Sequence, residues 1–389
     1  MVKINHVVAY ICIGIFSISC NTRTESLHKT QYAINDRLKL TVDSIIIPLD
    51  SISLPQYMSY YTSYYEDDSS ALLYAFNSKT WNIDVFDLNE KIVRNHIHLE
   101  REGSNGINSD VMTLQAITID SIFIYDGFNF IFINGEGKVL SRTNAYWERG
   151  DYSAFLYYQP SSLPFYNRED KKIYGRYITT KEPFSYADNE LFAAYDTQNN
   201  TWEILSPEYP LYMQNNRKRF GRNSWLNAHF TKDRISYSFS VLPDIFIYEL
   251  NKHTSKMSGG ESKLMDNSGQ FYSGNEKDDN AKWIHLLDNP NFDPILYDHY
   301  NDIYYRISFG EFISTPDYSN SGHFYKKIVL TVFDNSLRLI YETILPNYKF
   351  NFNGYFLSSK GLLIFGNNPL NENVDYEKLV LYNIQPCGL

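Results

Sequence analysis

A short hairpin pattern recurs six times in this sequence and constrains the fold more than any other feature. Each copy has an apolar residue, an aromatic residue and a third residue that is usually polar, followed by a turn and then a second strand-like run. The aromatic residues of the six copies are Phe86, Phe132, Tyr195, Tyr248, Phe333 and Tyr382. Short apolar and aromatic runs broken by Asn, Asp and Gly are typical of antiparallel strands. Repetition of one such unit indicates an array of similar sheets.

The spacing of the copies predicts an all-β fold, a β-propeller with six blades. Successive aromatic residues lie 46, 63, 53, 85 and 49 positions apart, and a blade of four short strands needs about 40–50 residues. The longest interval contains residues 253–280, which are rich in Ser, Gly, Lys and Asp, so we expect an insertion there that forms a surface loop. The alternative is a two-sheet sandwich with repeated hairpins, but six copies spread over most of the chain exceed one sandwich.

Apolar runs before the hairpins predict the remaining strands. Second strands are expected at Leu72–Phe76, Ser121–Tyr125, Ile235–Phe239 and Leu362–Phe365, and first strands at Tyr57–Tyr61, Val111–Ile119 and Trp283–Leu287. The sixth copy has no outer strand after it, whereas the apolar run Leu38–Pro48 has no blade of its own. We therefore expect Leu38–Pro48 to pair with the last hairpin and close the ring, because closure removes the exposed edge of an open sheet.

Residues 1–20 are interpreted as a lipoprotein signal peptide. Val7–Ile18 is an almost unbroken apolar run after Lys3, and it is shorter than the about 20 residues that a membrane-spanning helix needs. A small residue precedes Cys20, as in the bacterial lipobox, where the cysteine is diacylated, although Ser17 stands where that motif usually has Leu. The alternative is an ordinary secretory signal with a chance cysteine. Polar residues 21–36 are expected to form a flexible tether to a propeller over residues 37–389.

Charge and cysteine content narrow the classes of partner. With 35 basic and 45 acidic residues the formal net charge is −10, so general attraction to the phosphates of nucleic acid is not expected. Cys12 leaves with the signal peptide and Cys20 carries the lipid, so Cys387 has no partner for an intramolecular disulfide. We expect a membrane partner through palmitate-type chains on Cys20, and no cofactor. The predicted location is the outer membrane of the cell envelope, and the sequence allows either its periplasmic face or its outer face.

Several segments resemble those of a known family. The lipobox-like start, the hairpin Val85–Leu99, the turn Glu102–Ile107 and the segment Tyr297–Arg306 are similar to the "domain of unknown function 4221" lipoproteins of Bacteroidetes. That family is related to TolB-like and NHL-like six-bladed propellers. The resemblance covers nearly the whole mature chain and implies a fold and an envelope location. It implies no established activity and supplies no catalytic residues.

The candidate site residues come from local patterns, because no strong catalytic motif is present. The turn made by Gly103, Ser104, Asn105 and Gly106 suggests a tight loop whose backbone amides are available to a ligand. The alternative is that this turn shapes the crossover from blade one to blade two. His96 and His98 share one face of a strand, but such a pair without a third ligand is a weak metal site, and exposed strand residues are the alternative.

A second group of candidates depends on the ring. His229, His285 and His299 fall in different predicted blades and could converge at a central funnel. Arg306 either points into the channel, where it could bind a carboxylate, or is the buried partner of Asp298 or Asp302. The 34 tyrosines offer flat faces on which sugars stack, or they fill the space between blades.

These observations favour a non-enzymatic binding or scaffolding lipoprotein that holds a glycan, a peptide or an envelope protein. The alternative is an enzyme, a lyase or hydrolase, with its site in the central funnel. A third hypothesis is a structural subunit of an uptake complex. A convergent cluster of His, Asp, Glu and Arg with perturbed protonation at the axis would favour the enzyme. Unpaired, mixed residues there would favour binding.

Overall fold

The computed structural model describes most of the chain that follows the predicted signal peptide. The described residues are 23–24, 26–54, 62–107, 111–149, 152–157, 162–179, 191–207, 209–221, 226–275, 277–319, 322–368 and 370–388. The signal peptide with Cys20 and the first strand expected at Tyr57–Tyr61 lie outside these residues.

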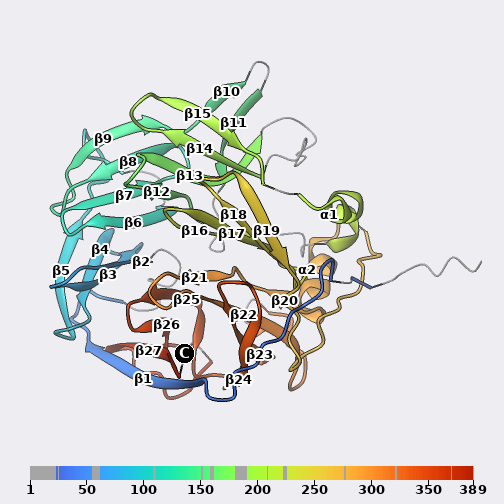
Figure 1. Cartoon of the computed structure of the whole chain (residues 1–389). Coiled ribbons are helices and arrows are strands. Elements are labelled where there is room, and N and C mark those ends of the chain that lie inside the picture. Colours follow the sequence, from blue (N-terminus) through green and yellow to red (C-terminus); the bar gives the residue numbers. More distant parts are fainter. Residues whose placement is uncertain are drawn as a thin grey trace, which may run out of the picture.

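Within the described residues the strands form six antiparallel sheets, arranged as blades around one axis (Figure 1). Blade one contains β2 (Thr62–Glu66), β3 (Ala71–Asn77), β4 (Asn82–Asp87) and β5 (Ile92–His98). Blade two contains β6 (Thr113–Thr118), β7 (Ser121–Tyr125), β8 (Asn129–Ile133) and β9 (Val139–Asn144). Blade three contains β10 (Trp147–Arg149), β11 (Tyr152–Tyr157), β12 (Phe165–Asn167), β13 (Lys172–Thr179), β14 (Phe192–Asp196) and β15 (Thr201–Leu205).

The second half of the ring follows the same plan. Blade four contains β16 (Leu226–Phe230), β17 (Arg234–Phe239), β18 (Ile245–Glu249) and β19 (Thr254–Ser258). Blade five contains β20 (Asn291–Phe292), β21 (Leu296–Asp298), β22 (Ile303–Phe312), β23 (Lys326–Asp334) and β24 (Leu339–Leu345). Blade six contains β25 (Asn351–Ser358), β26 (Gly361–Phe365), β27 (Lys378–Cys387) and β1 (Lys39–Pro48). The short helices are α1 (Leu211–Asn216), η3 (Arg217–Phe220), α2 (Asp279–Asp288) and η4 (Gly322–Tyr325).

The ring closes as the sequence predicts. Strand β1 pairs antiparallel with β27, so that Val42 lies opposite Ile384 and Ile46 lies opposite Val380. The side chain of Ile47 is fully buried, and it packs with Leu73 of blade one and Leu381 of blade six. Both ends of the propeller chain thus contribute to the same blade, and the expected six-bladed β-propeller is confirmed.

The recurring polar residue of the hairpin has a local structural role. The carboxylate of Asp87 accepts hydrogen bonds from the backbone N–H groups of Asn89 and Glu90, both at 3.0 Å, and Lys91 then adopts a left-handed conformation with φ 59°. Asp and Asn favour such turns because their side chains bond the backbone two and three residues on. The same arrangement recurs at Asp196 with Asn200 and at Asp298 with Asp302.

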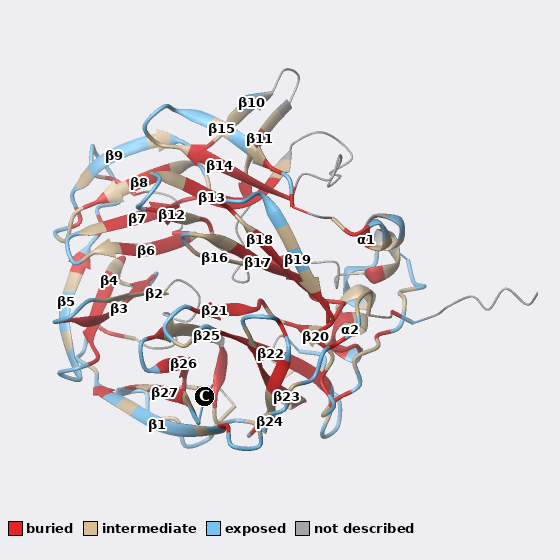
Figure 2. Cartoon of the chain, viewed as in Figure 1, coloured by how far each residue is buried: buried red, intermediate tan, exposed pale blue. Residues whose placement is uncertain are grey.

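The hydrophobic core is divided among the junctions between neighbouring blades. The middle strands β3, β7, β14 and β26 are buried along most or all of their length, whereas the outer strands β1, β5, β9 and β15 expose much of theirs (Figure 2). Aromatic side chains fill several of these junctions, among them Tyr74, Phe123, Phe192 and Tyr237. This use accounts for much of the aromatic content.

The insertion differs from its expected position. Thr254–Ser258 is β19, the outer strand of blade four, so the insertion begins at Gly259 and runs to the end of α2. The first strand expected at Trp283–Leu287 is wrong, because these residues lie in α2. The carboxylate of Asp278 caps that helix by accepting from Ala281 N at 2.9 Å, and the ammonium of Lys326 donates to the carbonyls of Leu287 and Asn289 at its other end.

Candidate functional site at the propeller axis

The innermost strands are fastened to one another by polar side chains. Ser63 Oγ of blade one accepts from Ala116 N of blade two at 2.9 Å. The Gln115 amide of blade two exchanges two hydrogen bonds with the backbone of Tyr166 in blade three, at 2.9 and 2.7 Å. Asn227 Nδ2 of blade four donates to Phe292 O of blade five at 2.6 Å. These three polar side chains therefore have a structural role between neighbouring blades.

One carboxyl with spare capacity lies where the first strand of blade five is broken. Asp293, Pro294 and Ile295 separate β20 from β21, and proline cannot donate a ladder hydrogen bond. Asp293 N donates to Ile307 O at 3.0 Å, which fixes the backbone, while Asp293 Oδ2 accepts from the hydroxyl of Tyr355 on β25 at 3.1 Å. Both side chains are partly exposed. The pair therefore joins blades five and six at the axis.

Burial sets the protonation of this pair. Burial raises the pKa of Asp293 to about 7, although the hydroxyl of Tyr355 and the charge of Arg306 oppose the rise. Burial, together with the nearby Asp293 carboxyl, raises the pKa of Tyr355 well above its ordinary value. Near neutral pH the phenol is thus uncharged, and the Asp293 carboxyl titrates in this range.

Arg306 does not bind either predicted carboxylate. Its fully buried guanidinium donates to Pro243 O at 2.6 Å and to Gly260 O, both in or after blade four. Asp298 instead caps its own turn, and Asp302 accepts from the Tyr297 hydroxyl at 2.8 Å. Burial lowers the pKa of Arg306 to about 9. Arg306 therefore joins blade five to blade four through these two carbonyls, and the expectation that it partners Asp298 or Asp302 is wrong.

Two of the three candidate histidines come together. His229 on β16 accepts from Tyr297 N through Nδ1 at 3.3 Å, and its pKa falls to about 4, first because of burial and then because of the charge of His299. His299 is exposed beside the ring of Tyr300. His285 lies apart on α2, where it accepts from Asn289 Nδ2 at 3.1 Å and burial lowers its pKa.

The turn at residues 103–106 has the contacts of a crossover. Ile107 N donates to Glu100 O at 2.7 Å, and Asn105 Oδ1 accepts from Val139 N in blade two at 3.2 Å. Gly103 has φ +83°, and a Cβ on Gly106 would lie 2.7 Å from the backbone of Glu102, so both positions require glycine. These contacts match the crossover interpretation, and a ligand at Ser104 stays a prediction.

A second polar cluster lies at the end of the axis where the first strands of the blades finish. Glu66 accepts from the backbone N–H of Ser359 at 2.8 Å, from its hydroxyl, and from the hydroxyl of Tyr300 at 3.2 Å. These residues come from blades one, six and five. The cluster completes the ring at the axis, as β1 completes it at the rim.

Both ring nitrogens of His96 also have hydrogen-bond partners. Its Nδ1 lies 2.7 Å from Asp84 Oδ1, and its Nε2 lies 2.8 Å from Asp50 Oδ2, whereas His98 Nδ1 lies 3.0 Å from Asn82 Oδ1. Among the residues that the structure describes, no group of three or more His, Cys, Asp or Glu side chains is placed to hold a metal ion. His96 therefore links blade one to the segment that leads into it.

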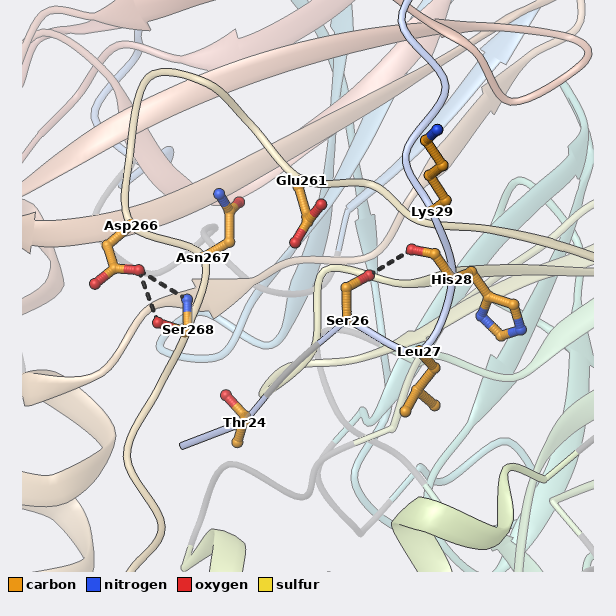
Figure 3. Close-up of a pocket in the computed structure, with 9 residues that line it drawn as sticks. All are labelled: Thr24, Ser26, Leu27, His28, Lys29, Glu261, Asp266, Asn267 and Ser268. Atoms are coloured by element: carbon orange, nitrogen blue, oxygen red, sulfur yellow. Dashed lines mark hydrogen bonds between the residues drawn. The ribbon is translucent and has the colours of Figure 1, made fainter. Parts of the chain in front are cut away.

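The segment expected to be a flexible tether instead lies against blades four and five along its described residues. The buried carboxylate of Asp244 accepts from Leu27 N at 2.9 and 3.0 Å, from His28 N at 2.8 Å and from the His28 ring at 3.0 Å. Thr30 forms an isolated parallel β-bridge with Gly259, and Tyr32 forms another with Leu339. This segment and the insertion line an open polar pocket of about 500 Å³ (Figure 3), formed by Thr24, Ser26, Leu27, His28, Lys29, Glu261, Asp266, Asn267 and Ser268.

Sequence patterns did not indicate Asp293, Tyr355, Glu66 or Asp244. The Asn-Pro-Asn-Phe-Asp-Pro run at 289–294 is the one signal that points to a broken strand. Tyr355, Glu66 and Asp244 form hydrogen bonds with residues that lie in another blade or more than 200 positions away in the sequence.

Radial sheets, a strand pairing that closes the ring, and side-chain links between inner strands together define a six-bladed β-propeller. Within that class, the chain belongs to the family described as "Domain of unknown function (DUF4221)", whose model matches residues 31–344. The resemblance inferred from the sequence is thereby confirmed.

Solved structures agree with this assignment of the fold. A DUF4221 family member from Bacteroides vulgatus ATCC 8482 is similar at 19% identity and a TM-score of 0.72, covering 90% of this chain and 98% of that one. A candidate exported protein of Bacteroides fragilis NCTC 9343 is similar at 11% identity and a TM-score of 0.54, covering 92% and 98%. No curated protein matches the sequence. No helix in the described part of the chain has the length and apolar character needed to span a bilayer.

Proposed function

We propose that this protein is an outer-membrane lipoprotein, anchored through acylated Cys20, that binds a neutral polar chain such as a glycan or a peptide at its axis. The observation that carries the binding role is the Asp293–Tyr355 pair, which is partly exposed and stands at a break in an inner strand. The fold supports the role because a propeller holds such groups on rigid strands.

The protonation of the axial groups supports a neutral ligand. Tyr355 is an uncharged phenol, His229 has a pKa of about 4 and is a neutral imidazole, and Asp293 has a pKa of about 7. Such groups donate and accept hydrogen bonds without presenting a strong charge. Hydroxyl and amide groups of a glycan or a peptide match this chemistry.

A funnel-site lyase or hydrolase is the second candidate, and one observation favours it. A carboxyl with a pKa of about 7 is suited to general acid–base work near neutral pH. Arg306 donates to backbone carbonyls and Glu66 binds Ser359 and Tyr300, so neither of these two charged side chains is paired with Asp293. We therefore rank binding above catalysis.

The test uses the full-length protein in detergent on glycan and peptide arrays. We expect Tyr355→Phe and Asp293→Asn to lose the hits of the wild-type protein by tenfold or more, since each removes part of the axial pair. Tyr376→Phe and Asp68→Asn, at exposed positions, are matched controls that should bind as wild type. Equal binding by all four variants would contradict the axial site. Mass spectrometry of the bound hits would reveal cleaved products if the enzyme hypothesis holds.

The anchor is tested separately. Palmitate should label the wild-type protein and the Cys387→Ala variant, but not Cys20→Ala. Fractionation of labelled cells should place the label in the outer membrane. Unchanged labelling of Cys20→Ala would remove the anchor from the proposal without affecting the axial site.

A further inference from the structure

The N-terminal segment is held to the propeller almost from the point where the predicted lipid is attached. Arg23 forms an isolated antiparallel β-bridge with Gln270. Thr24 N donates to Gly269 O at 2.8 Å, and Thr24 Oγ1 accepts from Gly269 N at 2.7 Å. The Asp244 carboxylate then holds Leu27 and His28. Thr24 and Asp244 are fully buried.

The reach of the remaining chain is short. Only residues 21 and 22 separate Cys20 from Arg23, and three residue steps span at most about 11 Å even when fully extended. A lipid on Cys20 would therefore hold the surface around Gly269 close to the head groups. A 16-residue free tether would have imposed no such orientation.

We propose that one surface of the propeller rests on the lipid bilayer. This anchor-side surface consists of α1 with η3, residues 266–275 and the first turn of α2, which lie together beside the start of the N-terminal segment (Figure 1). The proposal rests on the acylation of Cys20. The partner is the polar and head-group layer of the membrane.

Apolar, aromatic and basic side chains of the anchor-side surface suit that layer, and they stand beside the exposed carboxylates of Asp266, Asp278 and Asp279. Leu211 is 66% exposed on α1, and Phe271 and Tyr272 are half-buried, with the Arg219 guanidinium 3.7 Å from the Phe271 ring centroid. Tyr272 N donates to Arg219 O at 2.6 Å, which ties η3 to the insertion. Exposed Lys277 stands just before α2. Aromatic rings and long basic side chains are favoured at membrane interfaces.

This orientation assigns the two ends of the axis. The insertion and α1 precede the first strands of blades five and four, whereas Glu66, Tyr300 and Ser359 follow first strands. Because the first strands run in the same sense around a propeller, these groups lie at opposite ends. The end marked by Glu66 thus faces away from the lipid, toward the solvent and its ligands.

The experiment measures depth in vesicles with the lipidated full-length protein. Cys387→Ser gives a background without an accessible thiol, since Cys387 is the free and exposed cysteine of the described chain. Lys277→Cys reports the anchor-side surface, and Lys360→Cys, an exposed lysine in the turn beside Ser359, is the matched control at the other end. Each is labelled with a fluorophore and mixed with vesicles of phosphatidylethanolamine and phosphatidylglycerol that contain head-group nitroxide lipids.

We expect quenching at position 277 to exceed that at position 360 several-fold. Inserting about 20 Gly and Ser residues after Asn21, which adds a coil of about 25 Å, should reduce this difference. Equal quenching at the two positions in acylated protein would overturn the proposal and leave the anchor intact. Mass spectrometry that finds no lipid on the same sample would overturn both. A difference that persists after the insertion would overturn the role of the short reach.

Discussion

Glu66 in the first blade accepts a 2.8 Å hydrogen bond from the backbone of Ser359 in the last blade, across 293 positions of sequence. The hydroxyl of Ser359 and that of Tyr300 bind the same carboxylate. The ring is thus joined twice, by strand pairing at its rim and by this carboxylate at its axis.

Glu66→Ala should weaken the junction of blades six and one. The change leaves the N–H of Ser359 without its acceptor, and the loss of a charged hydrogen-bond partner costs about 1–3 kcal/mol. Urea unfolding should show this as a lower midpoint with an unchanged slope. Glu136→Ala, at an exposed turn of blade two, is the control and should differ from wild type by less than about 0.5 kcal/mol. Equal midpoints for the two variants would contradict the role of Glu66.

Two adjacent isoleucines of β1 test closure at the rim. Ile47 is fully buried between blades six and one, whereas Ile46 is 45% exposed. Ile47→Ala should reduce the free energy of unfolding by about 2–5 kcal/mol because it leaves a cavity, and Ile46→Ala should cost far less. Thermal and urea unfolding of both variants would measure the difference. A larger loss at Ile46 would mean that the register of β1 on β27 is shifted by one residue.

The contact of His96 with two aspartates should make stability depend on pH. Burial alone would lower the pKa of His96, but its hydrogen bonds to Asp84 and Asp50 raise it. Burial alone would raise the pKa of Asp50, but the hydrogen bonds that it accepts from His96 and from the backbone N–H groups of Ser53 and Ile52 lower it to about 2. The histidine contribution is complete below pH 6.5 and is lost as the pH rises through the raised pKa. The Asp50 contribution is complete above pH 3.8 and is lost as the pH falls toward 2.

His96→Gln should therefore destabilise the protein most between about pH 4 and pH 6.5. We expect a loss of about 1–3 kcal/mol there, because both Asp50 and the fully buried Asp84 lose the His96 ring, and a smaller loss at pH 9. Burial raises the pKa of Asp84, although the hydrogen bonds from His96 and Asn77 oppose the rise. His98→Gln, two residues along the same strand, is the control. A difference between wild type and His96→Gln that is independent of pH would contradict the charged contact.

Asp293→Asn should stabilise the protein at high pH, where the wild type loses the contribution of the Asp293 proton. Because burial raises the pKa of Asp293 from 3.8 to about 7, the folded protein holds a proton that the unfolded chain releases, and wild-type stability falls as the pH rises through that range. The variant should match wild type at pH 4 and exceed it at pH 8 by up to about 4 kcal/mol, the ceiling for such a change in pKa. Asp68→Asn controls for the loss of an exposed carboxyl. Identical pH profiles for Asp293→Asn and wild type would mean that Asp293 is already ionised below neutrality.

The blades could be predicted because their signals are local. Asp87 and Asp196 follow their aromatic residues directly and cap their own turns, so each hairpin is complete within a few positions. Strand β1 could also be placed, because Leu38–Pro48 was the apolar run without a blade and ring closure supplied its partner.

The site depends on contacts between blades, and no local pattern encodes them. Asp293 and Tyr355 look like ordinary residues of two different strands until the ring brings them together. Arg306 was expected to meet a nearby carboxylate, but its guanidinium crosses to the carbonyls of Pro243 and Gly260 in the neighbouring blade. The polar residues around Ser26 and His28 resemble a linker by composition, and the distant Asp244 carboxylate is what orders them.

The pairing of β1 with β27 also sets an order of events during synthesis. Residues 39–48 leave the ribosome long before their partner at 378–387 has been made. Until then β1 is an unprotected β-edge with apolar Val42, Ile45 and Ile47, which is the kind of segment that associates with other chains. A nascent or translocating chain therefore leaves this edge open until residues 378–387 emerge, and a product that lacks those residues could not pair it.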